Sequence, residues 1–89
     1  MDMNFSEALR AIQDGEKMQR SGWNGKGMFV FVVRGSNPAE ISGDYSVNSI
    51  VWPGECLPFI AMKTADNKLV PWLASQTDLL ANDWQSFVE

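Results

Sequence analysis

A glycine-rich loop that runs directly into an apolar segment constrains this chain more than any other feature. Residues 20–27 read Arg-Ser-Gly-Trp-Asn-Gly-Lys-Gly, and the next six residues, 28–33, are all apolar. Three glycines within six residues permit positive φ angles and let the backbone approach a bound group closely. The apolar segment predicts a buried strand that holds the loop in place.

The strand predicted over residues 28–33 is apolar on both faces. Its side chains alternate between two sets: Met28, Val30 and Val32 on one face, and Phe29, Phe31 and Val33 on the other. Each face needs cover from another layer. A helix near the N-terminus covers one face, and we expect another copy of the chain to cover the second. The sequence therefore predicts a homo-oligomer.

The remaining segments predict a single α+β domain over residues 1–89, with a small antiparallel sheet, an N-terminal helix and a short C-terminal helix. Asn4 and Glu7 have capping-box spacing, and apolar residues at helical spacing follow as far as residue 12. Ser75 and Asp78 have the same capping-box spacing before a short helix over residues 79–81.

Several short strands complete the predicted sheet. The turn-type residues at 65–67 separate segments 59–64 and 68–72, which predicts a β-hairpin with a positive φ in the turn, ending at a proline. A brief strand over 16–19 precedes the glycine loop, and a closing strand falls within 83–88. Glycines and prolines interrupt residues 34–58, which we interpret as a variable loop or hairpin arm.

The distribution of charge limits the partners. The chain has 11 acidic and 7 basic residues, a formal net charge of −4. Nucleic acids and anionic membranes favour an excess of Lys and Arg, so we expect no DNA, RNA or membrane partner. Residues 17–39 nevertheless contain Lys17, Arg20, Lys26 and Arg34 without any acid, a local charge of +4. This segment suits a small anion.

Missing residue types exclude several kinds of active site. The chain has no histidine, which excludes Ser-His-Asp catalysis, Cys-His catalysis and His-ligated metal. Its one cysteine, Cys56, has no neighbouring base and fits a reducing compartment. Asp66, Asp78 and Asp83 each have an ordinary place in a turn, a helix cap or a helix end. We expect no enzyme, metal or cofactor and, without signal or membrane-spanning segments, a cytoplasmic location.

Four tryptophans divide into two kinds. Trp52 and Trp84 are assigned to the core, whereas Trp23 and Trp72 each adjoin a polar loop at a strand end. A Trp face beside free N–H groups and cations suits a flat base with phosphates, so we expect these two rings to form an aromatic slot. Hydrogen bonds would come from polar residues nearby: Asn24, Ser75, Gln76 and Thr77. The alternative is a glycine turn entering a core strand, with Trp23 merely packed.

Several segments together resemble a known family. The most specific are the Trp-Asn-Gly-Lys loop at residues 23–26 and the Pro-Trp-Leu-Ala-Ser-Gln-Thr-Asp segment at 71–78. The matching segments as a whole are residues 4–9, 22–29, 62–66, 70–81 and 83–84. In these the chain resembles the small phage and prophage family that contains the second type of Thoeris anti-defence protein. The resemblance covers most of the chain except residues 35–57.

The resemblance implies a non-enzymatic sponge for an immune signal. Thoeris defence makes a cyclic ADP-ribose isomer, and these proteins are similar to homotetrameric cages that sequester it, with ligand pockets between subunits. The implied place of action is the cytoplasm of the infected bacterial host. On this interpretation Trp23 and Trp72 contact the base and ribose. The diphosphate and the remaining polar contacts fall to the other site residues: Asn24, Gly25, Lys26, Gly27, Lys63, Thr64, Ser75 and Thr77.

Two other classes of function stay open. An enzyme that cleaves the same nucleotide is disfavoured by the missing histidine and the lack of an evident metal cluster. A protein-binding inhibitor would use the apolar residues within 34–58 against a host protein. Heating a mixture of protein and signal separates the first two, because a sponge releases intact ligand and an enzyme releases products.

Overall fold

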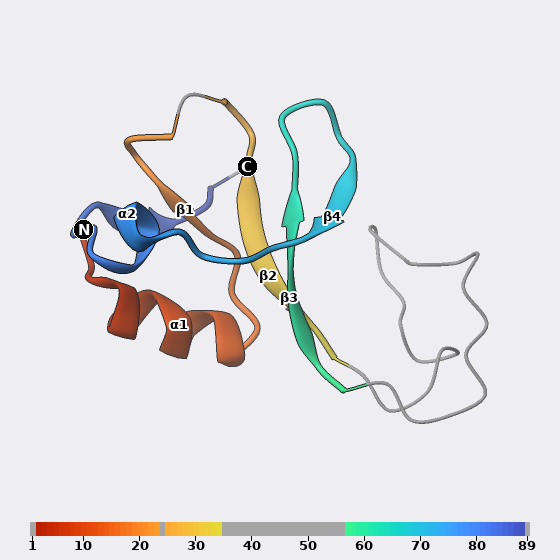
Figure 1. Ribbon diagram of the computed structural model, residues 1–89, viewed down its shortest axis with the longest axis horizontal. Coiled ribbons are helices and arrows are strands. Elements are labelled where there is room, and N and C mark those ends of the chain that lie inside the picture. Colours follow the sequence, from red (N-terminus) through yellow and green to blue (C-terminus); the bar gives the residue numbers. More distant parts are fainter. Residues whose placement is uncertain (1, 24, 35–56, 89) are drawn as a thin grey trace.

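The computed structural model describes residues 2–23, 25–34 and 57–88. Within them the order of elements is α1 (Phe5–Gln13), β1 (Met18–Arg20), β2 (Phe29–Val33), β3 (Phe59–Lys63), β4 (Leu69–Pro71), α2 (Gln76–Leu79) and β5 (Trp84–Ser86). All neighbouring strands are antiparallel (Figure 1), so the predicted α+β fold with two helices is confirmed. Most of the predicted arm, including Trp52 and Cys56, lies outside the described residues.

The five described strands form one sheet in the order β4-β3-β2-β1-β5. β2 lies at its centre and pairs with β3 along its whole length, from Phe29 opposite Lys63 to Val33 opposite Phe59. β1 corresponds to the brief strand expected before the glycine loop, and β5 is the expected closing strand. The chain leaves the sheet at β4 and crosses to the opposite edge through α2 (Figure 1).

Local hydrogen bonds fix the helix starts and the hairpin turn as the sequence predicts. The Asn4 side chain accepts the N–H of Glu7, and the Glu7 carboxylate accepts the N–H of Asn4. Ser75 and Asp78 make the same exchange at the start of α2. In the β3–β4 turn, Asn67 has a φ of 63°, the left-handed value that Asn tolerates better than most residues.

Several element ends differ from the predictions by a few residues, most clearly after β4 and in α2. Pairing of β3 with β4 continues one hydrogen bond beyond the proline that ends β4, because the Trp72 N–H donates to the Ile60 carbonyl at 3.0 Å. The helix α2 stops at residue 79 and does not include residues 80 and 81. At this end of the helix, the Asp78 carbonyl oxygen accepts the indole N–H of Trp84 at 2.9 Å and the backbone N–H of Ala81 at 3.4 Å.

The core lies between α1 and one face of the sheet. Ala8 and Ile12 of α1 pack with Met18, Val30 and Trp84 from three different strands, and all five are 0% exposed. Paired residues of antiparallel strands point to the same face, so this apolar surface is continuous from strand to strand. The helix α1 therefore provides the cover expected for one face of β2.

The opposite face of the sheet is also aromatic. Phe29 is 1% exposed, and its ring lies 5.7 Å from that of Phe31 and 4.6 Å from that of Phe87. The Lys17 ammonium lies 5.0 Å from the centre of the Phe29 ring, a cation–π contact. The prediction that a second copy of the chain covers this face stays a prediction.

Candidate functional site

The glycine loop connects β1 to β2 and lies beside the β3–β4 turn at one end of the sheet (Figure 1). The glycine loop and the β3–β4 turn lie at the same end of the sheet because Phe29, at the start of β2, is paired with Lys63, at the end of β3. The two turns are in close contact, since a Cβ added at Gly25 would lie 3.2 Å from the Ala65 Cβ. Gly27 has a φ of +77°, so this position in the loop requires glycine.

Three indole rings meet on the α1 side of the sheet. Trp23 lies 6.4 Å from Trp72 and 5.4 Å from Trp84, and Trp72 lies 6.0 Å from Trp84, all edge to face. Trp84 is fully buried, as predicted. Trp23 and Trp72 come together, but an edge-to-face pair leaves no parallel gap for a flat base between the rings. A base can stack only on the outer face of one ring.

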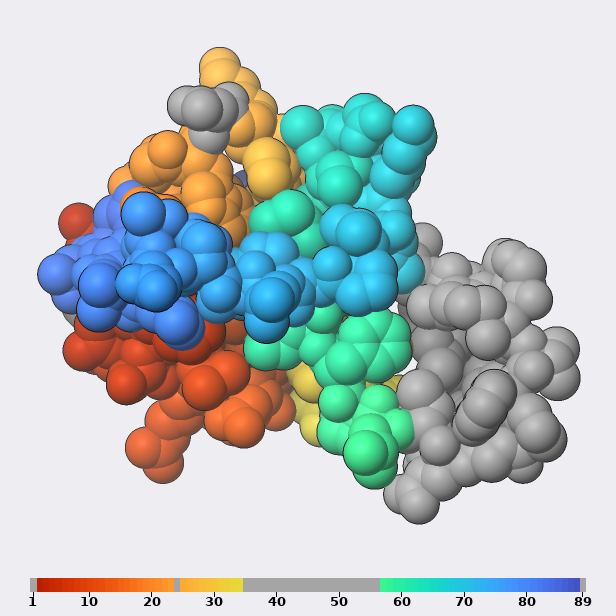
Figure 2. Space-filling view, viewed as in Figure 1, coloured from red at the N-terminus to blue at the C-terminus, as the bar shows by residue number. Residues whose placement is uncertain are grey.

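Trp23 also contributes to the core. It is half-buried and packs against the buried cluster beneath α1, as does Trp72. The alternative that Trp23 is a packed residue is therefore correct in part, while both rings keep part of their surface exposed. The segment from β4 to α2, which includes Trp72, runs across this face between α1 and the glycine loop (Figure 2).

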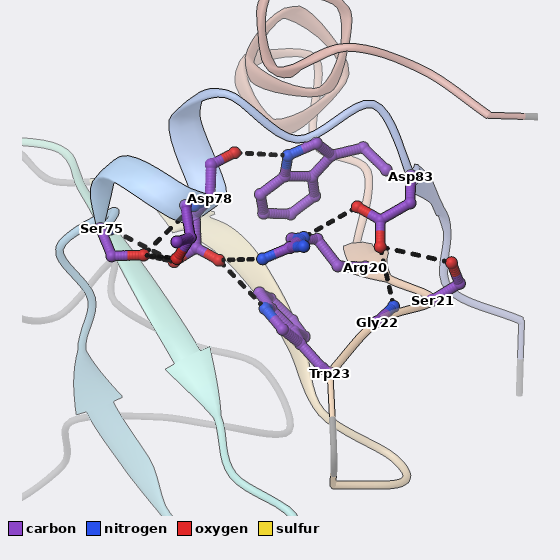
Figure 3. A network of polar contacts seen from close by, with 9 residues as sticks. Arg20, Ser21, Gly22, Trp23, Ser75, Asp78 and Asp83 are labelled. Carbon is purple, nitrogen blue, oxygen red and sulfur yellow. Dashed lines mark hydrogen bonds and ion pairs between the residues drawn. The ribbon is translucent and has the colours of Figure 1, made fainter.

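Asp78 of α2 organises the polar contacts around these rings (Figure 3). One carboxylate oxygen, Oδ1, accepts from Arg20 Nη1 at 2.8 Å and from Trp23 Nε1 at 3.2 Å. The other, Oδ2, accepts from the Ser75 hydroxyl at 2.9 Å and from the Ser75 N–H at 3.2 Å. The Asp78 side chain is only 12% exposed. The carboxylate thus joins the glycine loop to the start of α2.

Arg20 lies between two carboxylates. Its Nη1 contacts Asp78 Oδ1 at 2.8 Å and its Nε contacts Asp83 Oδ1 at 2.8 Å. Asp83 Oδ2 in turn accepts the Gly22 N–H at 2.8 Å, which ties the first glycine of the loop to the segment before β5 (Figure 3). Arg20 was expected to belong to a cationic segment that meets an anion. Its guanidinium is instead neutralised within the chain.

These contacts shift the pKa values of the three charged groups. Burial disfavours the charged form of Asp78, but hydrogen bonds from Arg20, Trp23 and Ser75 outweigh it and leave the carboxyl pKa below its ordinary value. For Asp83, the hydrogen bond from Arg20 is the main cause of a lowered pKa. Hydrogen bonds to Asp83 and then Asp78 raise the pKa of Arg20. All three groups are therefore charged at neutral pH.

Lys63 supports the far end of the glycine loop. Its ammonium donates to the Gly27 carbonyl at 2.7 Å and lies 5.8 Å from the centre of the Phe29 ring. Lys63 is 8% exposed, although it is charged. It lies on the face of the sheet opposite the tryptophans, since it pairs with Phe29. Lys63 and the Trp23–Trp72 pair are thus on different sides of the sheet.

The other predicted site residues have different surroundings. Lys26 is exposed in the glycine loop, and Asn24 lies outside the described residues. The hydroxyls of Ser75 and Thr77 are 2.8 Å apart, beside Asp78. The Thr64 hydroxyl donates to the Lys68 carbonyl at 3.1 Å and is used within the β3–β4 turn. The structure therefore brings Trp23, Trp72, Ser75 and Thr77 together and leaves Thr64 in a turn.

Sequence reasoning missed the shared role of Asp78 and Asp83. It placed Asp78 in a helix cap, which is correct, and Asp83 after the helix. Their common partner Arg20 is 58 and 63 residues away, respectively. The only signal in the sequence was an arginine at the start of the glycine loop, which needs a counter-charge if it is partly buried.

The part of the chain that the structure describes contains neither a metal-binding cluster nor a membrane-spanning helix. No group of three or more Cys, Asp or Glu side chains in the described ranges is placed to hold a metal ion. No helix in that part of the chain is long and apolar enough to span a membrane.

Comparison with known proteins identifies the family. The family model described as a Thoeris anti-defense 2-like domain matches residues 3–87. The chain belongs to this family. The match spans the glycine loop, the tryptophan cluster and the Arg20 contacts together. The resemblance drawn from the sequence is therefore confirmed.

A curated relative agrees with this assignment to the Thoeris anti-defense 2-like family. The protein named Thoeris anti-defense 2, from Bacillus phage SP01, is 44% identical over 88 residues, covering 92% of this chain and 91% of the relative. Family membership supports a phage anti-defence role for the chain. The name of the family is that of an inhibitor of defence and describes no catalysed reaction.

Proposed function

We propose that this protein binds and sequesters a cyclic ADP-ribose-type immune signal without cleaving it. The observation that carries the proposal is the Trp23 indole, held by Asp78 beside the glycine loop and still partly exposed. An aromatic face next to loop N–H groups suits a ligand that has both a flat base and a diphosphate. The family assignment gives the biological setting, which is phage anti-defence against Thoeris.

Within this proposal each residue has a role. Trp23 and Trp72 contact the base and ribose through their exposed surfaces. The N–H groups of Gly25 and Gly27, with Lys26, hold the diphosphate. The supporting polar contacts come from Asn24, Ser75, Thr77, Lys63 and Thr64, of which Lys63 acts mainly by fixing the loop through Gly27.

Assembly is part of the same proposal. Trp23 and Trp72 keep part of their surface exposed, and a neighbouring subunit placed over them would enclose a nucleotide. We propose a homotetramer with ligand pockets between subunits, acting in the cytoplasm of the infected bacterium, where the signal is made.

The affinity required of a sponge is physically accessible. A ligand of roughly 35 heavy atoms at about 0.3 kcal/mol each reaches about −11 kcal/mol, a low-nanomolar dissociation constant. Sequestration needs affinity in this range because the protein must capture the signal stoichiometrically.

Calorimetric titration with the cyclic ADP-ribose isomer made by a Thoeris synthase tests the proposal. The expected result is a nanomolar dissociation constant and recovery of the intact nucleotide after the protein is heat-denatured. Recovery of hydrolysed products would assign the protein as a nucleotide-cleaving enzyme. Absence of binding to any cyclic nucleotide would leave a protein-binding inhibitor as the function.

A further inference from the structure

We propose that Asp78 is a positioning residue of the nucleotide site. Its carboxylate holds the Trp23 indole and the base of the glycine loop in their binding arrangement before a ligand arrives. The inference rests on the proposed function, because it assigns an internal support to that same site. Asp78 itself is 9% exposed and acts through Trp23.

The hydrogen bonds of Asp78 require a carboxylate. Four donor contacts converge on its two oxygens, from Arg20, from Trp23 and twice from Ser75. An ionised carboxylate is acceptor-only on both oxygens, whereas the amide of Asn turns an N–H₂ group towards at least one of these donors. Substitution by Asn therefore removes support from one side of the network while changing the volume little.

Asp78 fixes two indole rings by two different groups. Its side chain holds Trp23 Nε1 at 3.2 Å, and its backbone carbonyl holds Trp84 Nε1 at 2.9 Å. The two rings pack edge to face, 5.4 Å apart. The Trp23 ring cannot rotate without breaking its bond to Oδ1 and its packing on Trp84. Its side-chain entropy is thus lost on folding and not on binding, which favours affinity.

Asp83 provides a matched control. It accepts from Arg20 at 2.8 Å and from the Gly22 N–H at 2.8 Å, so it supports the same loop. Among the interactions of the described residues, Asp83 has no hydrogen bond to Trp23. Losing either carboxylate weakens the Arg20 network, but only the loss of Asp78 releases the indole.

The experiment compares Asp78→Asn, Asp83→Asn, Trp23→Phe and the double variant Asp78→Asn with Trp23→Phe. Each is titrated with the cyclic ADP-ribose isomer made by a Thoeris synthase, at a temperature where melting curves show that it is folded. We expect Asp78→Asn to bind about tenfold more weakly, a loss of about 1.4 kcal/mol, and Asp83→Asn to stay within about threefold of wild type. Near-ultraviolet circular dichroism without ligand should change in Asp78→Asn and persist in Asp83→Asn.

The double variant tests whether Asp78 acts through Trp23. Phenylalanine keeps a ring at position 23 but has no N–H to hold, so adding Asp78→Asn should cost no further affinity. If Asp78→Asn fails to fold, Asp78→Glu serves, since it keeps the carboxylate but displaces it from the Trp23 indole N–H by one methylene. A tenfold loss of affinity in Asp78→Glu supports the inference, and unchanged affinity overturns it.

Three results would overturn the inference. Asp78→Asn that binds as wild type shows that the carboxylate does not position the site. Equal losses in Asp78→Asn and Asp83→Asn show a general weakening of the Arg20 contacts. Wild-type protein that binds no cyclic nucleotide overturns the proposed function and this inference with it, whereas the first two results leave the proposed function intact.

Discussion

Trp23 serves two purposes at the scale of a single residue. It packs against the core and donates to Asp78, and part of its surface stays open to a ligand. We expect Trp23→Ala to lower stability by about 2–3 kcal/mol, less than the loss for a fully buried aromatic residue. Affinity for the cyclic ADP-ribose isomer should fall tenfold to about a hundredfold, as for other aromatic residues that stack on bases.

The measurement pairs a thermal melt without ligand with calorimetry on the same variant, below its melting range. Trp84→Ala is the control for stability, because Trp84 is 0% exposed and cannot touch a ligand in the folded state. A Trp23→Ala protein that is destabilised but binds at wild-type strength would assign Trp23 to the core alone.

Lys26 and Lys68 differ in the function expected of their charge. Both are exposed, but Lys26 lies in the glycine loop and Lys68 lies in the β3–β4 turn, where it pairs with Asp66 at 3.3 Å. We expect Lys26→Glu to weaken binding of the nucleotide about tenfold, because it places a negative charge beside the diphosphate. Lys68→Glu should leave affinity nearly unchanged, since exposed ion pairs contribute little.

Titrations of both variants at two salt concentrations check this prediction. The salt dependence of wild-type binding should be mild, because one or two cations meet a compact ligand, unlike the many phosphate contacts of a DNA-binding protein. Equal losses in the two variants would contradict the assignment of the diphosphate to the glycine loop.

At the scale of elements, Arg20 joins three parts of the chain. It lies at the end of β1 and contacts Asp78 in α2 and Asp83 immediately before β5. Both carboxyl pKa values are lowered in the folded state. Burial raises the pKa of Asp78, but the hydrogen bonds from Arg20, Trp23 and Ser75 outweigh it. For Asp83 the hydrogen bond from Arg20 is the main cause of the lowered pKa. A group with a depressed folded pKa contributes stability above its unfolded value of about 3.9, and this stability is lost as the pH falls through the folded value.

The melting temperature should therefore stay nearly constant from about pH 7 to about pH 5 and fall as the pH drops below about 4. Melts at constant ionic strength across this range measure the effect. In Asp83→Asn the fall should be shallower, because one of the two linked carboxyl groups is gone. A wild-type curve without an acid decline would contradict the assigned pKa directions.

The sequence predicted those elements whose signals are local. Both capping boxes connect residues three positions apart, and the positive φ of Asn67 depends on a three-residue turn. The alternating side chains of β2 fix which residues meet α1 without any knowledge of the partner. For these elements, a segment of a few residues contains all the information that decides its structure.

The arrangement of the tryptophans could not be predicted in the same way. That Trp23 and Trp72 meet follows from the strand ends, but their edge-to-face geometry depends on Trp84, which arrives from the last strand. The placement of Lys63 on the opposite face from Trp23 required the register of β2 with β3. Distant pairings of this kind leave no periodic signal in a single sequence.

At the scale of the whole molecule, exposed apolar side chains gather around α2. Leu73 is 92% exposed, Leu80 is 78% exposed and Leu79 is 45% exposed. Exposed apolar patches of a soluble domain often mark surfaces that contact another protein. We expect light scattering at micromolar concentration to report a multiple of the chain mass, with a tetramer as the proposed assembly.

Leu80→Asp should shift this mass towards that of the monomer and weaken nucleotide binding, because the proposed pockets lie between subunits. Val88→Asp, at a site that is 82% exposed near the end of the chain, is the matched control and should change neither property. A monomeric wild-type protein that still binds the nucleotide tightly would contradict the intersubunit pocket.

The closing strand gives the protein a dependence on the order of its synthesis. Met3 and Trp84 exchange backbone hydrogen bonds of 2.7 and 3.1 Å, and β5 pairs with β1. Residues that are synthesised early therefore form their backbone hydrogen bonds with residues that are synthesised late. During translation, α1 and β2 emerge long before the carboxylates of Asp78 and Asp83 that Arg20 requires. The indole cluster can therefore close only after Asp78, Asp83 and Trp84 have been synthesised. Ribosomes that stall after β4 would release a chain that has every predicted phosphate contact but no fixed tryptophan.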